Sequence, residues 1–292
     1  MAELSKIQKK IKKTKDLSSV VRTMKSIAAV NIRHYEKAVR SVREYFHSIE
    51  LGFQILVHNH PEILSIEQRE AKVKIIGTIV IGSERGMCGE FNDRLHHYFT
   101  RILQEQQKEM PQVHVLSIGE HITYRLEDKF QVKSFAFPSS FEGVGELLWS
   151  LLEVIADWRE VYQIEEIRLF YNRMVSGSAY EPAMLQVLPL DLRWLFELKQ
   201  RKWESRTIPT FSIPWEELFA ELVQEYIYIS LYRGFAESLA SENASRLRAM
   251  HAAQQNIEDH LKELEKGYHQ QRQNSITEEL FDILSGFELL RD

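Results

Sequence analysis

The 292-residue sequence predicts an α/β domain inserted between two long terminal helices, which pack antiparallel as a coiled coil. Three observations lead to this fold class. Residues 3–57 contain no proline, and no glycine precedes Gly52. Residues 215–290 also lack proline. Between these stretches, short β-branched runs alternate with helical patterns, an order that is typical of a mostly parallel sheet.

The first helix follows from an apolar repeat with alternating spacings of three and four residues, as in a coiled coil. The repeating residues are Leu4, Ile7, Ile11, Val21, Ala28, Ile32, Tyr35, Val39, Val42, Phe46 and Ile49. Thr14, Ser18 and Lys25 make the middle of this seam polar. A helix of about 55 residues is about 80 Å long. The pattern therefore predicts a coiled-coil helix over 1–58.

The middle of the chain predicts an α/β domain over 72–192. Short buried strands are expected at Val73–Ile81, Val113–Ile118 and Ile167–Tyr171, with helices at Arg94–Lys108 and Gly145–Trp158. Residues 182–213 contain prolines and the run LKQRKWESR. We expect this segment to be a loop-rich return to the second long helix.

The second long helix is predicted over 212–292. Pro214 suits a first-turn position, and apolar residues recur at helical spacing from Leu222 to Leu290. Gly234, Gly267 and Gly286 are expected to mark close packing or bending. Because the apolar seams of both helices must be covered, and because the domain between them acts as a hairpin, we expect the helices to pack antiparallel.

One glycine-rich turn, GSERGMCG at Gly82–Gly89, follows the first predicted strand. Such turns often hold phosphates or nucleophiles. This one has neither the Gly-Lys-Ser/Thr of a phosphate loop nor a G-x-G-x-x-G fingerprint. Ser83 and Cys88 would need a nearby base to act as nucleophiles. We interpret the segment as a structural turn, with a catalytic loop as the alternative.

Charge is unevenly distributed along the chain. Residues 1–50 carry 12 Lys and Arg against 5 Asp and Glu, a net charge of +7, whereas the remainder carries −12. Such asymmetry suggests that the basic segment has its own partner. We interpret the run from Lys6 to Lys15 as a solvated coiled-coil face, with phosphate contact as the alternative. No nucleic-acid partner is expected.

Few residues suggest metal or redox chemistry. The single cysteine excludes an internal disulfide and a Cys-rich metal site. His58 with His60 and His96 with His97 could bind a metal, but they lack carboxylate or Cys partners and are better explained as surface residues. No apolar run reaches the roughly 18 residues of a membrane span.

Five collinear segments together resemble the gamma subunit of F-type ATP synthases over nearly the full length. They are LSKIQKKIKKTKDLSSVVRTMKSIAAVNIRHYEKA, IVIGSERGMCGEFN, LFYNRMVSGSAYEPAMLQVLPL, LYRGFAESLASENASRLRAMHAAQQNI and YHQQRQNSITEELFDILSG. The first contains the Thr-Met-Lys of that family's N-terminal helix. The second is similar to its Ser-Asp-Arg-Gly-Leu-Cys-Gly turn, with Glu84 in place of Asp.

The resemblance implies a central rotor shaft with a Rossmann-like domain that lacks nucleotide chemistry. Such a shaft rotates inside a ring of three alpha and three beta subunits and contacts the epsilon subunit and the membrane rotor c-ring. It couples ion flow to ATP synthesis or hydrolysis at the beta subunits. The resemblance implies no catalytic residue, cofactor or metal. It implies a peripheral location on the cytoplasmic face of a bacterial cell membrane, with an organellar inner membrane as the alternative.

Several residues are carried over as partner contacts by the resemblance. Met24 and Lys25 would face the beta subunits, and Arg246 would lie on the opposite arm. The turn residues that would pack near epsilon and the rotor ring are Glu84, Arg85 and Cys88. The C-terminal residues that would contact a loop of beta are Arg272, Gln273, Thr277 and Glu279, with Phe287 at an apolar tip.

This chain departs from the family at several places. Val30 and Asn31 replace a common basic residue, and Phe287 replaces a small one. The return segment DLRWLFELKQRKW is basic and aromatic where the family is often acidic. Two rival functions remain open on the residues alone, a static coiled-coil adaptor and a nucleotide-using enzyme. Purification with a six-membered catalytic ring would separate the rotor from both.

Overall fold

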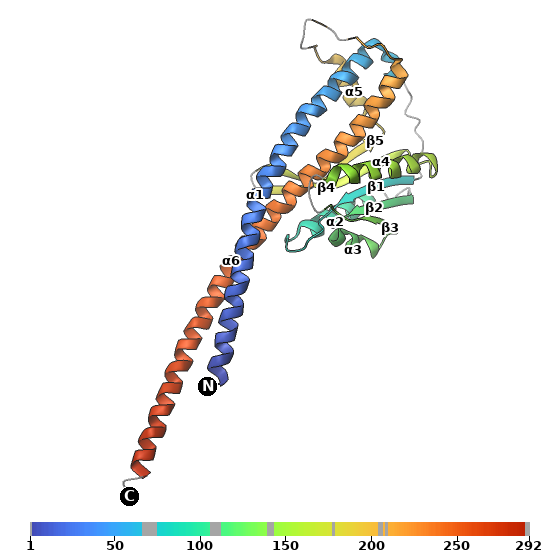
Figure 1. Cartoon of the computed structure of the whole chain (residues 1–292). Coiled ribbons are helices and arrows are strands. Elements are labelled where there is room, and N and C mark those ends of the chain that lie inside the picture. The colour runs from blue at the N-terminus through green and yellow to red at the C-terminus, as the bar shows by residue number, and fades with distance from the viewer. Residues whose placement is uncertain are drawn as a thin grey trace. The chain divides into compact units, whose positions relative to one another are not determined.

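The structure, a computed structural model, describes residues 2–65, 75–105, 112–138, 143–176, 179–203, 207 and 210–289. The chain forms two compact units. Met1–Ala29 and Arg246–Asp292 make up one, the terminal unit, and Val30–Ser245 make up the other, the central unit. Two long helices, α1 (Ala2–Asn59) and α6 (Trp215–Leu289), each contribute to both units (Figure 1).

Helix α1 confirms the first predicted helix, with 58 residues. Every apolar position of the predicted seam is buried or half-buried, and Val21, Ala28 and Val42 are at most 5% exposed. The polar positions Thr14, Ser18 and Lys25 are half-buried as well. The repeat therefore continues through the polar stretch without a break in the helix.

Helix α6 confirms the second, with 75 residues. The glycines of α6 differ in how closely other residues approach them. A Cβ at Gly234 would lie 2.5 Å from Leu169 Cδ2, so α6 approaches the sheet closely there. A Cβ at Gly267 would meet nothing within 4 Å. Only Gly234 therefore shows the close packing that was expected of these residues, and the surroundings of Gly286 lie outside the described side chains.

A five-stranded sheet of order β3-β2-β1-β4-β5 forms the middle of the central unit. The strands are β1 (Ile75–Ile81), β2 (Gln112–Ile118), β3 (Val132–Phe135), β4 (Glu166–Ser176) and β5 (Ala179–Leu188). All neighbouring pairs are parallel except β4 with β5. The three predicted strands and the mostly parallel arrangement are confirmed, although residues 73–74 lie outside the described part of the chain.

Helices cover both faces of the sheet. On one face, α2 (Phe91–Glu105) and α3 (Glu120–Glu127) bury side chains such as Leu95 and Ile122 against Val80 and Phe170. On the other, α4 (Val144–Glu160), the C-terminal part of α1 and the N-terminal part of α6 pack on Ile79 and Leu169 (Figure 1). Burial on both faces explains why the central strand β1 is a continuous apolar and β-branched run.

The expectation of a loop-rich return over 182–213 is wrong in part. Strand β5 extends to Leu188, and helix α5 (Leu192–Gln200) follows it. The carboxylate of Asp191 accepts a hydrogen bond from the Arg193 backbone N–H at 2.8 Å and so caps α5. Leu195 and Leu198 anchor this helix in the core. A short 3-10 helix, Pro61–Ser65, lies beside it in the fold.

Candidate partner-binding surfaces

The glycine-rich turn between β1 and α2 is held by very close backbone contacts. A Cβ at Gly82 would lie 2.3 Å from Ile122 Cβ. Gly119, at the end of β2, has a φ of +102°, and a Cβ there would lie 2.8 Å from both the carbonyl carbon and oxygen of Ser83. Only glycine fits these positions without moving the backbone. The two loops that follow β1 and β2 are thus locked together.

The carboxylate of Glu84 completes this lock. Its Oε2 accepts hydrogen bonds from the backbone N–H of Glu120 at 3.2 Å and of Phe137 at 3.0 Å. Glu120 is the first residue of α3, so the carboxylate satisfies an N–H that the helix itself leaves without a partner. It also places negative charge at the positive end of the helix dipole. Glu84 therefore joins the loops after three neighbouring strands.

Cys88 lies inside the turn and is 3% exposed. Its sulfur is 3.5 Å from the Ser83 hydroxyl and 3.6 Å from the Asn92 amide, and Asn92 Nδ2 donates to Ser83 Oγ at 2.8 Å. The Cys88 carbonyl accepts a hydrogen bond from Ser245 of α6 at 2.6 Å. These contacts favour the structural turn over the catalytic loop.

Two neighbouring residues of the turn face outward. Arg85 is exposed, and Met87 is 60% exposed with a φ of +59°. A positive φ is uncommon for a side chain other than glycine, and such strain is often found where a surface is used for binding. Of the three turn residues predicted to meet partners, the structure presents Arg85 to solvent and uses Glu84 and Cys88 inside the fold.

In the terminal unit, α1 and α6 pair in antiparallel orientation. Gln8 Nε2 donates to the Tyr268 hydroxyl at 2.8 Å, and Lys15 Nζ lies 3.1 Å from Glu265 Oε1. Lys25 then contacts residues 251 and 254, so partner numbers fall as α1 numbers rise. This confirms the predicted antiparallel pairing.

We expect a disulfide to form readily between cysteines introduced at Ile11 and Leu264, which are half-buried at facing levels of this pair. A matched control joins cysteines at Ile11 and Ile276, because position 276 lies about 18 Å further along α6. The measurement is the shift in gel mobility after mild oxidation. Equal cross-linking of both pairs, or of neither, would contradict the pairing. The buried native Cys88 should not compete.

Lys25 is already engaged within the terminal unit. Its Nζ is 3.2 Å from His251 Nδ1 and 3.2 Å from Gln254 Oε1. Because an ammonium group only donates hydrogen bonds, the His251 nitrogen is the acceptor in this contact. Lys25 therefore joins α1 to α6 in the polar middle of the seam. Because it is only half-buried, part of its side chain remains exposed to solvent.

Met24 lies beside an exposed apolar stripe on α1. Met24 is half-buried, whereas Leu17, Val20 and Ile27 are 52%, 51% and 55% exposed. Positions 17, 20, 24 and 27 share one helical face because they are three or four residues apart. Sequence reasoning identified Met24 but not the stripe around it, although the spacing of these apolar residues could have shown it.

The predicted contacts on α6 are spread along its length in the terminal unit. Arg246 is half-buried and is the first residue of the α6 segment of the terminal unit. Arg272, Gln273, Thr277 and Glu279 are exposed, and the Thr277 hydroxyl donates to the Gln273 carbonyl at 2.9 Å. Phe287 belongs to the last turns of α6, and its side chain is outside the described residues. The structure thus does not gather the predicted residues into one patch.

In the central unit, α6 is fixed to the sheet by a buried polar cluster. Arg233 Nε donates to Glu237 Oε1 at 2.8 Å, and Ser238 Oγ donates to the Ile81 carbonyl at 3.3 Å. Burial, together with the charge of Glu237, raises the pKa of Tyr171 on β4. The hydrogen bond from Ser238 to the last residue of β1 joins α6 directly to the sheet.

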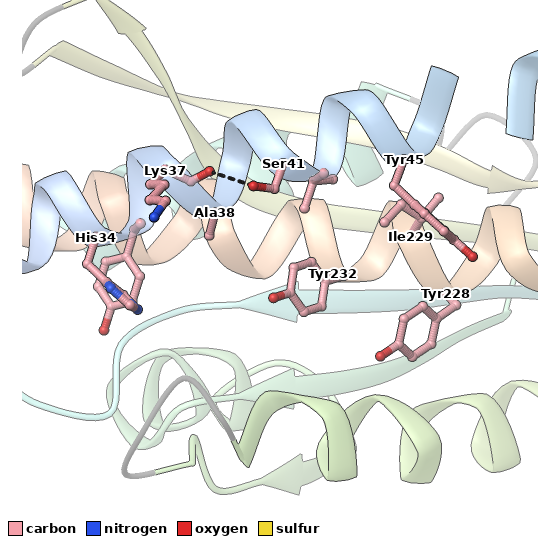
Figure 2. A pocket seen from close by; sticks show the side chains of 10 residues that line it. His34, Lys37, Ala38, Ser41, Tyr45, Tyr228, Ile229 and Tyr232 are labelled. Carbon is pink, nitrogen blue, oxygen red and sulfur yellow. Dashed lines mark hydrogen bonds between the residues drawn. The ribbon is translucent and has the colours of Figure 1, made fainter. Parts of the chain in front are cut away.

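A groove of about 800 Å³ lies on the same unit, between α1 and α6 (Figure 2). Its lining residues are His34, Tyr35, Lys37, Ala38, Ser41, Val42, Tyr45, Tyr228, Ile229 and Tyr232. Sequence reasoning missed this groove, because its tyrosines on α1 and those on α6 are more than 180 residues apart in the chain.

The histidine pairs do not gather metal ligands. His60 Nδ1 lies 2.9 Å from Glu62 Oε1, and His97 Nδ1 lies 2.7 Å from the Asp93 carbonyl. Burial lowers the pKa of His96, and the nearby charge of His97 adds to this. Within the described ranges, no group of three or more His, Cys, Asp or Glu side chains is placed to hold a metal ion.

Comparison with known proteins agrees with this architecture. The sequence model of the ATP synthase family matches residues 3–290. The ATP synthase gamma chain of Trichlorobacter lovleyi is 26% identical over 297 residues and covers 100% of both chains. That of Syntrophus aciditrophicus is 27% identical over 295 residues and covers 99% of both chains.

Solved structures show the same fold. A rotor chain of the Euglena gracilis mitochondrial ATP synthase has a TM-score of 0.61 and 17% identity, and the match covers 94% of this chain and 99% of that chain. A chain of the Tetrahymena thermophila central stalk and c-ring has a TM-score of 0.58 and 18% identity, over 80% of this chain and 99% of that chain. The family match over almost every residue decides the assignment, and the chain belongs to the ATP synthase family, in which its relatives are the non-catalytic gamma chains.

Proposed function

We propose that this chain is the central rotor shaft of an F-type ATP synthase and couples ion flow through the membrane sector to ATP synthesis or hydrolysis. The helical segments 1–58 and 212–292 act as the shaft, and 72–192 act as the foot domain. Three alpha and three beta subunits surround the shaft, and the epsilon subunit and the c-ring bind the foot. The chain itself performs no catalytic step.

The family match over residues 3–290 carries this proposal, and the antiparallel pairing of the terminal helices fits it. A shaft must transmit torque along its axis. Two helices without a proline, joined by side-chain contacts at several levels, provide a continuous hydrogen-bonded element for this. A static adaptor would not need to resemble ATP synthase gamma chains in sequence along its whole length.

Rotation of the chain tests the proposal directly. The complex is purified through the beta subunits and fixed to a surface, and a bead is attached to a cysteine introduced at Tyr124, which is 64% exposed. Addition of ATP should rotate the bead in one direction. A chain that is absent from the purified ring, or a bead that stays still while the ring hydrolyses ATP, would contradict the proposal.

The partner contacts follow the residues predicted from the sequence. Met24, Lys25 and Arg246 face the beta subunits, and the exposed groups at positions 272, 273, 277 and 279 contact a loop of beta. Phe287 turns within an apolar bearing. Arg85 contacts the epsilon subunit or the rotor ring, while Glu84 and Cys88 keep the turn in the shape that presents it. The exposure of Arg85 supports this division of roles.

The chain is proposed to be a peripheral protein on the cytoplasmic face of a bacterial cell membrane. The bacterial origin of the two similar gamma chains supports the bacterial setting. In the part of the chain that the structure describes, no helix combines the length and apolar character of a membrane-crossing segment. Membrane fractionation should recover the chain with the membrane, and its release after the c-ring is removed would fit attachment through the ring.

We expect the isolated chain to bind no ATP at micromolar concentration and to hydrolyse none. The turn at Gly82–Gly89 lacks the lysine and the Ser/Thr of a phosphate loop. Calorimetric titration of the full chain with ATP and magnesium is the measurement, and the catalytic ring is the positive control. Stoichiometric binding by the isolated chain would support the nucleotide-using enzyme instead.

A further inference from the structure

We infer that a single water molecule is bound between α6 and the sheet, where it joins the Glu237 carboxylate to the Ser241 hydroxyl. Both residues belong to the central unit, and they are 5% and 0% exposed. Neither residue is among the predicted partner contacts. The water site is therefore independent of the proposed function.

Two oxygen atoms at this place need hydrogen-bond partners. Among the described residues, none forms a hydrogen bond with Glu237 Oε2 or with Ser241 Oγ, and both atoms are buried. A buried polar group without a hydrogen bond is unfavourable, and buried water commonly supplies the bonds that protein groups leave unmade. The two oxygens lie on successive turns of the same helix, so one small polar molecule can reach both.

The Ser241 hydroxyl differs from other helical serines of this chain. Ser41, Ser48 and Ser150 each donate to the backbone carbonyl four residues earlier, at 3.4, 3.5 and 3.3 Å. For Ser241 the equivalent acceptor is the carbonyl of Glu237, and this bond is not formed. The hydroxyl is therefore left for a partner outside the backbone of its own helix.

The neighbours of Ser241 show which way this part of α6 faces. Ser238 and Ser245 lie three residues before it and four residues after it, so the three serines share one helical face. Ser238 Oγ donates to the Ile81 carbonyl at the end of β1, and Ser245 Oγ donates to the Cys88 carbonyl in the turn. Ser241 lies between them and so faces the carboxyl end of the sheet.

The chemistry of the two groups selects water over an ion. Glu237 Oε1 already accepts a hydrogen bond from Arg233 Nε at 2.8 Å, so the charge of the carboxylate is balanced. Hard metal ions take about six or more oxygen ligands, whereas the described residues offer two unused oxygens here. The carboxylate would repel an anion. Water can donate to the carboxylate and also bond the hydroxyl.

The spacing fits one water molecule. Side chains four residues apart on a helix have Cβ atoms roughly 5–6 Å apart, a gap that a water spans with two hydrogen bonds of about 2.8 Å each. Tyr171 of β4 lies on the other side of the carboxylate. Burial raises the pKa of Tyr171, and the nearby charge of Glu237 adds to this. A direct bond from the Tyr171 hydroxyl to Glu237 Oε2 is therefore the competing arrangement.

Ser241→Ala tests the site in the full chain through the sign of its effect on stability. With water bound, the alanine removes one partner of the water and leaves Glu237 Oε2 buried and unpaired. The midpoint of thermal unfolding, followed by tryptophan fluorescence, should then lie about 3–6 °C below that of a control. The control is Ser150→Ala, which gains the same helix propensity but removes a hydroxyl that bonds its own helix.

The opposite result overturns the inference. Without water, Ser241→Ala merely removes a buried hydroxyl that has no partner, which is neutral or stabilising. A midpoint equal to or above that of Ser150→Ala therefore excludes the bound water, and any midpoint clearly below it supports the water.

A density map of the full chain, at a resolution that shows other buried waters, locates the ligand directly. We expect a peak about 2.6–3.2 Å from both Glu237 Oε2 and Ser241 Oγ. Ser241→Ala should lose this peak, whereas Ser238→Ala should keep it, because the Ser238 hydroxyl bonds the Ile81 carbonyl instead. The inference fails if the map shows no peak, or if the Ser241 or Tyr171 hydroxyl bonds Glu237 Oε2 directly.

Discussion

Gly119→Ala should lower the free energy of unfolding of the central unit by about 3 kcal/mol or more. Gly119 has a φ of +102° and a ψ of 132°, a region that is essentially restricted to glycine, and holding another residue type there costs about 1–3 kcal/mol. The new Cβ would also lie 2.8 Å from the Ser83 backbone, which cannot rotate away. Overpacking adds about 1–3 kcal/mol.

Tryptophan fluorescence during urea unfolding measures this loss, because all five tryptophans belong to the central unit. The midpoint of thermal unfolding should fall by about 10 °C. Gly145→Ala is the control, since a Cβ there meets nothing within 4 Å in α4. This variant should gain about 0.5 kcal/mol. Equal free energies of unfolding for the two variants would show that the close contact between Gly119 and Ser83 does not stabilise the central unit.

Met24→Lys should lower the number of ions pumped per ATP hydrolysed by about 2- to 5-fold, with hydrolysis itself changed much less. A contact between the rotating shaft and the beta subunits must be weak at every rotational angle. A tight contact at one rotational angle becomes a barrier to rotation. A new ammonium group on the shaft can pair with a carboxylate of a beta subunit at one angle. An exposed pair is worth about 0–1 kcal/mol and a partly desolvated one more.

Ion pumping and hydrolysis are measured side by side in membranes that contain the variant. Met24→Leu separates charge from packing, because it keeps an apolar side chain beside the stripe at Leu17, Val20 and Ile27 and should leave the ratio unchanged. If Met24→Lys leaves both rates unchanged, or lowers both in proportion, Met24 does not lie at a coupling contact.

The strongest patterns of the sequence predicted the long helices and the central strand. The apolar repeat of α1 extends over many heptads, so the polar interruptions at Thr14, Ser18 and Lys25 did not hide it. Strand β1 is buried on both faces and is therefore a continuous β-branched run. In both cases the pattern was clear because residues that are close together in the sequence are buried in the same part of the fold.

Shorter elements escaped prediction because distant residues stabilise them. Strand β5 includes Pro182 and pairs along the edge of the sheet, and proline normally argues against a strand. Helix α5 has only Leu195 and Leu198 fully buried, which is too few for a clear helical period. The role of Glu84 was equally hidden, since its hydrogen-bond donors are Glu120 and Phe137, 36 and 53 residues away.

The terminal unit combines the first residues of the chain with the last, and this has a consequence for biosynthesis. Residues 1–29 are synthesised before their partner, which begins at residue 246. At about 5–20 residues per second, the N-terminal segment waits roughly 10–40 s for its partner. During that time the part of its apolar seam that α6 covers in the folded protein has no partner, and the like charges of the lysines between Lys6 and Lys15 oppose its close association with another copy.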